Sequence, residues 1–264
     1  MTTNTKTLFA ALLKELPADC VADIGSRDGD QAMLFRDLLP NAAVLAFEAN
    51  PLMFKQMSAN PRLRQHRIEI FPYAVADKKG TLDFHITDVD YSNPEENRGT
   101  SSLLVHSDVK VKEVISIEAC RIDTFILERY PQISRIGLWI DAEGAEYRIL
   151  QGMEGIKDRV YAVHVETSNE ALRIGQKTYA EICALMNSYG FEPCGSNIGA
   201  GAVWGDVVFI RSDWRRKLGM RFNLCKAKAA ISRWVQADQI AVTLKTRAPG
   251  LYRVLRALYI RLFT

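Results

Sequence analysis

Between residues 20 and 210, short apolar runs alternate with segments whose apolar residues recur at helical spacing. The runs at 21–24 and 43–47 have the length of buried strands, whereas 31–39 has the period of an amphipathic helix. Strands that alternate with helices pair in parallel, and right-handed crossovers then cover both faces of the sheet. The alternation therefore predicts an α/β fold with a doubly wound, mostly parallel sheet, whose ligands bind beyond the carboxyl ends of the strands.

Further segments continue this pattern along the chain. Asn50 and Pro51 predict the start of a helix, with asparagine as its cap and proline in its first turn. The polar segment 88–102 interrupts the pattern, and a loop of this length often closes over a ligand. The remaining predicted elements are helices at 5–16, 145–152 and 179–189, and strands at 67–71, 81–86, 136–140, 160–165 and 203–210.

The distribution of charge divides the chain near residue 210. Residues 1–210 carry 21 Lys and Arg against 29 Asp and Glu, whereas residues 211–264 carry 13 against 2. We therefore expect one catalytic domain over 1–210, with an N-terminal helix within 1–19 and its core at 20–210. A basic tail follows over 211–264, and its charge predicts contact with something anionic.

The tail predicts amphipathic helices, because leucines recur on one helical stripe among basic residues. The stripe consists of Leu251, Leu255, Leu258 and Leu262, and an upstream candidate helix contains Trp214, Leu218, Phe222 and Trp234. Basic residues beside aromatic and leucine side chains suit an anionic membrane surface. The same stripe could instead pack on the catalytic domain or form a homodimer. We expect no nucleic-acid partner, because no recognised binding motif accompanies the charge.

The five cysteines are widely spaced and form no C-x-x-C pair, which predicts packed thiols in a reducing cytosol. No run approaches the roughly 18 apolar residues that a membrane-spanning helix needs. The expected location is therefore the cytoplasm, with peripheral contact at the inner face of the membrane through the tail.

A glycine-containing turn follows the first predicted strand. Gly25 would permit a turn that a side chain obstructs, and Gly29 would let the start of the next helix lie close to a ligand. Backbone N–H groups at a helix start favour a negative group such as a carboxylate. Glu48 ends the second strand, where an acidic residue can accept both hydroxyls of a ribose. Turn and acid together predict a nucleoside site; the alternative is an ordinary turn and a solvated glutamate.

The turn also discriminates between nucleotides. Dinucleotide sites usually have the pattern G-x-G-x-x-G, whereas Arg27 occupies the second glycine position here, which argues against NAD. A carboxylate at Asp23 suits the ammonium group of an amino-acid-like ligand, directly or through water. S-adenosylmethionine combines such a group with a ribose and an adenine. We therefore predict S-adenosylmethionine as the cofactor, with an NAD-dependent oxidoreductase as the alternative.

Three further carboxylates follow predicted strands. Asp141 comes directly after the strand at 136–140, Glu143 lies two residues later, and Glu166 follows the strand at 160–165. Crowded carboxylates raise at least one pKa, which prepares a group for proton transfer. An alcohol needs such a base, because it is a poor nucleophile while protonated. We expect Asp141 to anchor the cofactor and orient the acceptor, and Glu143 or Glu166 to act as the base.

Other interpretations of the same residues stay open. Glu143 and Glu146 could serve the N-terminus of the helix that follows them. His164 is expected to be a packed strand residue, not a catalyst. The carboxylates could also hold Mg²⁺, which takes oxygen ligands, but only their spacing supports this, and we predict no metal site.

Several segments together resemble the FkbM-type methyltransferases, a family of class I enzymes that act mainly on oxygen. They occur in the expected order over about residues 20–210, and they read VADIGSRDGD, VLAFEANP, YAVADKKGTLDF, TSSLL, RIDTF, LWIDAEGAEYRILQGME and VHVETS. The resemblance implies a Rossmann-like seven-stranded sheet and S-adenosylmethionine as methyl donor. It places the turn at 74–77 near adenine, with Asp77 as the polar contact. The sequence differs from the family at Arg27, where a small or amide residue is common, and at Trp139, where many members carry lysine.

The resulting donor site comprises Asp23, Gly25, Ser26, Arg27, Gly29, Glu48, Ala49, Asn50, Asp77 and Asp141. The resemblance implies methyl transfer to a hydroxyl of a glycan, a glycolipid or another secondary metabolite, that is, a small-molecule, glycan or lipid-linked acceptor. An alternative outside the enzymes is a membrane- or partner-docking module that keeps the fold without activity.

Overall fold

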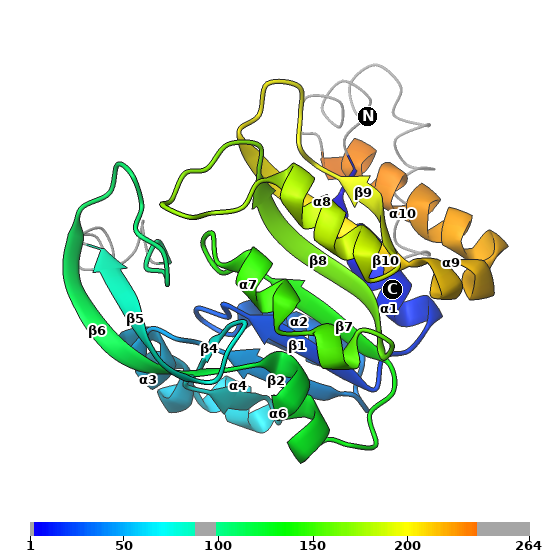
Figure 1. The fold of residues 1–264 in the computed structure, drawn as a ribbon. Coiled ribbons are helices and arrows are strands. Elements are labelled where there is room, and N and C mark those ends of the chain that lie inside the picture. The colour runs from blue at the N-terminus through cyan, green and yellow to red at the C-terminus, as the bar shows by residue number, and fades with distance from the viewer. Residues whose placement is uncertain (1–2, 88–98, 237–264) are drawn as a thin grey trace, which may run out of the picture.

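A seven-stranded sheet forms the centre of the protein (Figure 1). The computed structural model describes residues 3–87 and 99–236. The strand order is β3-β2-β1-β7-β8-β10-β9. Strands β3 to β8 in this order pair in parallel, and β10 runs antiparallel to both β8 and β9. The predicted Rossmann-like, mostly parallel sheet is confirmed. Its strands are β1 (Cys20–Ile24), β2 (Ala43–Phe47), β3 (Glu69–Phe71), β7 (Ile136–Ile140), β8 (Val160–Ser168), β9 (Phe191–Ser196) and β10 (Trp204–Arg211).

Helices cover both faces of this sheet. One hydrophobic cluster joins the sheet to α1, α2, α3, α4, α9 and α10, and a second joins its other face to α6, α7 and α8. In Figure 1, α7 and α8 lie in front of the sheet. The helices are α1 (Thr5–Glu15), α2 (Asp30–Leu38), α3 (Pro51–Ala59), α4 (Pro61–Gln65), α6 (Ile122–Arg129), α7 (Glu146–Gln151), α8 (Tyr179–Ser188), α9 (Ser212–Leu218) and α10 (Met220–Gln236).

A smaller sheet lies beside the central one and contains β4 (Ala74–Val75), β5 (Gly80–Thr87) and β6 (Val111–Cys120), in the order β4-β6-β5. The predicted strand at 81–86 is confirmed by β5. No predicted strand corresponds to β6, because only two of its residues are buried and its sequence therefore lacks an apolar run. Residues 88–98 of the predicted loop lie outside the described residues.

The local signals at helix ends behave as predicted. The Asn50 side chain accepts a hydrogen bond from the Leu52 N–H at 3.0 Å, and Pro51 occupies the first turn of α3. Helix α8 begins with a capping box between Thr178 and Glu181. It ends just before Gly190, whose φ of 83° suits glycine.

The first part of the basic tail packs on the catalytic domain. Helix α10 lies beside α1 and buries Phe222, Cys225 and Ala229. The buried Ser232 hydroxyl lies 3.1 Å from the Asn4 side-chain nitrogen, which donates a hydrogen bond to it. Of the interpretations of the tail, packing on the catalytic domain is therefore present within 212–232, whereas the leucine stripe at 251–262 lies outside the described residues. Within 3–87 and 99–236, no helix is both long and apolar enough to cross a bilayer.

All five cysteines lie within the described residues and are free thiols. Cys20, Cys194 and Cys225 are buried, which confirms the prediction of packed thiols and leaves these three inaccessible to a disulfide partner at the surface.

Candidate active site

The ends of β1 and β7 meet at Gly25. The Asp141 N–H donates to the Ile24 carbonyl at 3.0 Å, which brings the two strand ends together. A Cβ atom at Gly25 would lie 1.8 Å from the Asp141 carbonyl oxygen, and the glycine has a φ of 81°. Only glycine tolerates both the left-handed backbone and this close approach. Gly25 therefore sets the distance between the predicted cofactor turn and the predicted catalytic strand.

A cavity opens where these strands end. It encloses about 760 Å³, including the part open to solvent. Six of the predicted donor-site residues line it: Gly25, Arg27, Glu48, Ala49, Asn50 and Asp141. The cavity therefore lies at the carboxyl ends of β1, β2 and β7, as expected for a doubly wound sheet.

Glu48 connects two segments that line this donor cavity, the turn at Arg27 and the residue before α3, Asn50. Its carboxylate accepts the Arg27 N–H and the Asn50 N–H, each at 2.7 Å. The Glu48 side chain is buried. A carboxylate has about four acceptor sites, so Glu48 can also accept the two hydroxyl groups of a ribose. Arg27 has a φ of 58°, and its hydrogen bond to Glu48 holds the turn in this left-handed conformation.

Asp23 and Ser26 lie behind the cavity and do not line it. The Ser26 hydroxyl donates to the Asp23 carboxylate at 2.6 Å, and both side chains are buried. Burial raises the pKa of Asp23 to about 7, and the Ser26 hydrogen bond opposes the rise. The contact of Asp23 with a ligand ammonium group, directly or through water, stays a prediction.

Gly29 and Asp77 also fall outside the lining of the donor cavity. A Cβ atom at Gly29 would lie 2.7 Å from the Leu63 side chain, so this glycine makes room for α4. The Asp77 carboxylate accepts a hydrogen bond from Arg148 Nε at 2.7 Å. The turn at 74–77 does reach the cavity, but through Ala74 and Val75. In the structure Asp77 therefore forms an ion pair, and its contact with adenine stays a prediction.

The three predicted catalytic acids come together. Carboxylate oxygens of Asp141, Glu143 and Glu166 lie within 4.8 Å of one another. Asp141 and Glu143 both line the donor cavity, so the cluster lies at its edge. Carboxylates at this spacing could also ligate a divalent cation, and the prediction of a metal-free site stays a prediction.

Burial and mutual repulsion raise the pKa of all three acids. Desolvation raises the pKa of Glu166 to about 9, and the neighbouring Asp141 and Glu143 charges raise it further. Desolvation raises the pKa of Glu143 to about 7, against the attraction of Arg173. Asp141 is exposed as a residue, but protein atoms surround its carboxyl group. Desolvation and the nearby Asp206 charge therefore raise the pKa of Asp141. The environments of Glu143 and Glu166 thus separate their pKa values, the pattern expected of an acid–base pair.

The loop that carries Glu143 is held by Glu146. The buried Glu146 carboxylate accepts the Ala142 N–H at 3.1 Å and the Gly144 N–H at 2.9 Å. The carboxylate therefore accepts hydrogen bonds from N–H groups just before the start of its own helix, which is one of the two interpretations of Glu146. Glu143 has a φ of 55° and forms an ion pair with Arg173. A glutamate in this backbone region costs about 1–2 kcal/mol, so the loop around it enforces its position.

His164 is a packed strand residue, as predicted. Its ring stacks on Trp139 with centroids 3.5 Å apart, and neither ring nitrogen has a hydrogen-bond partner within the described part of the chain. Burial lowers the pKa of His164 well below its usual value. Trp139 packs on Phe9 and Phe35 beneath α1 and α2, so it belongs to the hydrophobic core.

Two groups of site residues have no counterpart among the predicted ones. The first is the apolar wall of the donor cavity, which suits a flat base and consists of Met53, Tyr73, Phe84, Leu103 and Ile149. The second is Arg173, which reaches Glu143 from the segment after β8. Tyr73 adjoins the predicted turn at 74–77 and could have been found, whereas no sequence signal connects Arg173 to Glu143.

Comparison with known proteins identifies the family. A model of the methyltransferase FkbM domain matches residues 19–193, so the chain belongs to the FkbM methyltransferase family. A similar curated protein is the 2-O-methyltransferase NoeI of Sinorhizobium fredii (strain NBRC 101917 / NGR234). It is 28% identical over 188 residues, which cover 67% of this chain and 74% of that protein.

Two solved structures illustrate the similarity in fold. Methyltransferase FkbM from Methylobacillus flagellatus KT is 12% identical with a TM-score of 0.46, covering 73% of this chain and 43% of that one. Magnesium protoporphyrin IX methyltransferase from Synechocystis PCC 6803, with bound S-adenosylmethionine, is 10% identical with a TM-score of 0.43, covering 79% and 78%. The chain therefore spans less than half of the first of these proteins.

The family membership decides between the two cofactors considered above. The chain is an S-adenosylmethionine-dependent methyltransferase and not an NAD-dependent oxidoreductase. The donor cavity fits this group, because it combines a carboxylate for a ribose, an apolar wall for a base and carboxylates where a positive sulfonium would lie.

Proposed function

We propose that this methyltransferase transfers a methyl group to a hydroxyl oxygen of a glycan, a glycolipid or another secondary metabolite. One observation carries the proposal: Asp141, Glu143 and Glu166 form a cluster of carboxyl groups with raised pKa at the edge of the donor cavity. A hydroxyl must lose its proton as it attacks, and this cluster supplies acceptors for it. The name of the similar NoeI protein, a 2-O-methyltransferase, supports oxygen as the target atom.

S-adenosylmethionine, when bound, supplies an electrophilic methyl group on a positively charged sulfur. Glu48 would hold the ribose hydroxyls, while Ala49, Asn50 and Arg27 complete that wall of the cavity. Gly25 and Asp141 would border the methionine end, where the ionised Asp141 carboxylate would attract the positive group of the ligand. Asp23, Ser26 and Gly29 would act by shaping the turn, and Asp77 by fixing the turn at 74–77 through Arg148.

The two glutamates take different roles in this proposal. Glu143, with a pKa of about 7, is partly ionised near neutral pH and acts as the base. Glu166, with a pKa of about 9, keeps its proton there and donates a hydrogen bond that orients the acceptor. In the balanced step, the acceptor oxygen forms a bond to the methyl carbon, the carbon–sulfur bond breaks, and the hydroxyl proton passes to Glu143.

The basic tail is the basis for a proposed location of the enzyme in the cell. We place the methyltransferase domain at 1–210 and an added basic segment at 211–264, which would contact an anionic membrane surface at the inner face of the cytoplasmic membrane. The support is the arrangement of α9 and α10. Their buried side packs on the domain, whereas Met220 and Leu224 are exposed beside basic residues such as Arg221. A lipid-linked acceptor would fit this location. Sedimentation with anionic and with neutral vesicles tests the contact, and light scattering tests the alternative homodimer.

Transfer of a labelled methyl group tests the proposed function directly. The protein is incubated with methyl-labelled S-adenosylmethionine and a panel of methyl glycosides, glycolipids and phenols, and mass spectrometry locates the label. We expect an O-methyl product, with the rate retained in EDTA. Binding of S-adenosylhomocysteine without labelling of any acceptor would contradict the proposal and favour an inactive docking module.

A further inference from the structure

A second cavity adjoins the acid cluster. It encloses about 670 Å³, including the part open to solvent, and shares Glu143 with the donor cavity. Glu166 and Thr167, at the end of β8, form another part of its lining. An acceptor placed here would lie beside both proposed proton-transfer groups, on the side of Glu143 that the donor does not use.

A large exposed aromatic side chain stands at this cavity. Trp204 begins β10, pairs with Ser168 of β8 and lines the cavity, yet its exposed fraction is 60%. Indole has a broad apolar face, and Trp and Tyr are enriched where proteins bind partners. The sheet position explains why the backbone is ordered here, but it does not explain why the side chain at this position is a tryptophan. A flat, partly apolar ligand that rests on the indole would explain the tryptophan.

Two buried polar groups at the same cavity have no partner in the described residues. They are Thr167 Oγ1 and Arg173 Nε, in side chains that are 3% and 6% exposed. An unpaired buried donor or acceptor costs about 1–3 kcal/mol, so native proteins rarely keep one without a use. Hydroxyl groups of a ligand both donate and accept, and would therefore satisfy both atoms.

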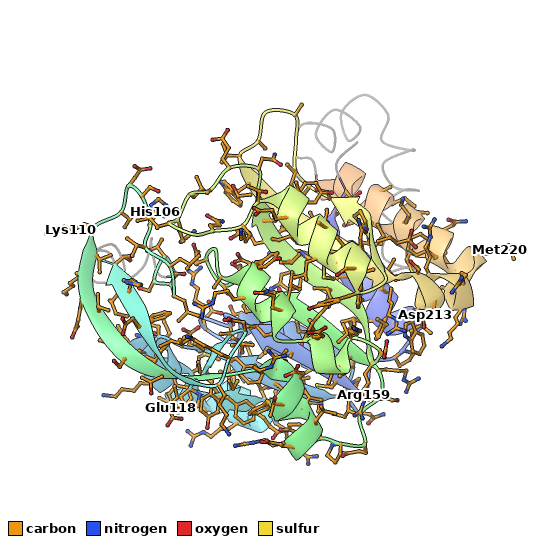
Figure 2. The ribbon with its side chains drawn as sticks, viewed as in Figure 1. His106, Lys110, Glu118, Arg159, Asp213 and Met220 are labelled. Atoms are coloured by element: carbon orange, nitrogen blue, oxygen red, sulfur yellow. The ribbon has the colours of Figure 1, made fainter. Side chains whose placement is uncertain are left out.

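The charge of the cavity selects against anionic ligands. Its lining contains Glu143, Glu146 and Glu166, whereas the single arginine, Arg173, is already paired with Glu143. The described lining therefore offers no unpaired lysine or arginine to a phosphate or a carboxylate. Figure 2 shows His106 beside the loop that follows β8, and a bridge between His106 and Arg173 joins the two segments. This bridge fixes two residues of the cavity lining relative to each other.

We propose that this second cavity is the acceptor site, and that it takes a neutral sugar ring whose apolar face rests on Trp204. Its hydroxyls contact Thr167 and Arg173, and one hydroxyl faces Glu143. This inference rests on the proposed O-methyl transfer and adds the acceptor class and its position.

The test compares neutral and acidic sugars on defined variants of the full chain. The probes are methyl glycosides of neutral hexoses and the matching methyl glycosides of their uronic acids. Saturation-transfer NMR with S-adenosylhomocysteine present measures contact, and labelled methyl transfer measures turnover. We expect contact with a neutral glycoside, at least tenfold weaker contact with its uronic acid, and the strongest transfer on one face of the ring.

Variants at the cavity separate ligand contact from folding. Trp204→Ala should raise the acceptor KM or Kd at least tenfold with an unchanged Kd for S-adenosylhomocysteine, and Trp204→Phe should recover most of the loss. Thr167→Val should weaken the sugar without lowering the melting temperature, because the hydroxyl has no protein partner. Leu34→Ala, at a side chain that is 61% exposed on α2, is the matched control.

Three outcomes would overturn the inference while leaving O-methyl transfer intact. They are transfer to a phenol with no contact to any neutral glycoside, a preference for the uronic acid, and an unchanged acceptor KM in Trp204→Ala. Failure of the wild-type protein to bind S-adenosylhomocysteine would instead overturn the proposed function, and the acceptor inference with it.

Discussion

Glu143 and Glu166 lie at the ends of neighbouring strands, and their surroundings give them different proton affinities. Glu143 faces Arg173, whose charge opposes the effect of burial, whereas the charges acting on Glu166 come from four carboxylates. In the proposed mechanism, the same residue type would therefore serve as the base at one position and as a hydrogen-bond donor at the other.

The activity should follow the ionisation of these two groups. Because the pKa of Glu143 is about 7, kcat/KM should rise about tenfold per pH unit below that value and then level off. It should fall again above about pH 9, where Glu166 loses its proton. Glu143→Gln should lower kcat by about 10²–10⁴-fold and remove the acidic limb. Steady-state rates from pH 5.5 to 10 check this, and an unchanged rate in Glu143→Gln would exclude it as the base.

Glu166 should also make the stability of the fold depend on pH. Its pKa is raised to about 9 in the folded chain from an ordinary 4.5, so the folded state binds more protons between these values. The free energy of unfolding should then fall as pH rises through this window. Glu166→Gln removes that dependence, so its melting temperature should exceed the wild type at pH 8–9 and match it near pH 4.5. A constant difference at all pH values would contradict this linkage.

At the same scale, the sequence predicts correctly that Asp141, Glu143 and Glu166 lie together, because they stand at or just beyond the carboxyl ends of neighbouring strands, which meet at one edge of the sheet. Their catalytic roles stay predictions. It does not predict Arg173, because the segment that carries this residue approaches the site only through the packing of the loop after β8. Tyr73 adjoins the predicted turn at 74–77 and could have been predicted from it. Asp77 and Gly29 have the residue types that a ligand site would use, but Arg148 and Leu63 engage them instead.

Gly25 is the contact on which the arrangement of β1 and β7 depends. Gly25→Ala would place a methyl group 1.8 Å from the Asp141 carbonyl oxygen, on a residue with a φ of 81°. We expect a loss of about 3–5 kcal/mol in the free energy of unfolding, from strain and from the displaced strand end. Urea denaturation measures it. Gly199→Ala, where the added carbon meets nothing within 4 Å, is the control, and equal losses in both variants would contradict the account.

Elements with a strong apolar pattern are predicted well from the sequence. The predicted bounds of β2 and β7 agree with the structure, because both strands are almost fully buried. The strands β6 and β9 are missed for physical reasons. Most of β6 is exposed, and β9 contains Pro193 and Gly195, which interrupt the apolar run. The family resemblance supplies the count of seven strands, which the pattern alone does not.

On the scale of the whole molecule, the charge boundary near residue 210 is not a boundary of packing. Helix α10 completes the hydrophobic cluster beneath α1 with Phe222, Cys225 and Ala229. The basic tail and the acidic domain therefore share a core in the region that the structure describes, and the tail should affect the stability of the domain.

Truncation tests this shared core. A chain ending at residue 210 should unfold at a lower temperature than one ending at residue 236, because it loses the apolar cover over α1. The expected difference is on the order of 3 kcal/mol, given the burial of one phenylalanine and several smaller side chains. Circular dichroism during heating measures it. Identical melting temperatures would show that α10 contributes no cover.

The central claim is that the cavity between β1, β2 and β7 binds S-adenosylmethionine through Glu48. Calorimetric titration with S-adenosylhomocysteine tests this most directly, with NAD as the comparison ligand and Glu154→Ala as a variant at an exposed glutamate. We expect one saturable site in the wild type and in Glu154→Ala, at least tenfold weaker binding in Glu48→Ala, and no heat with NAD. An absence of saturable binding, or equal affinity in Glu48→Ala, would contradict the claim.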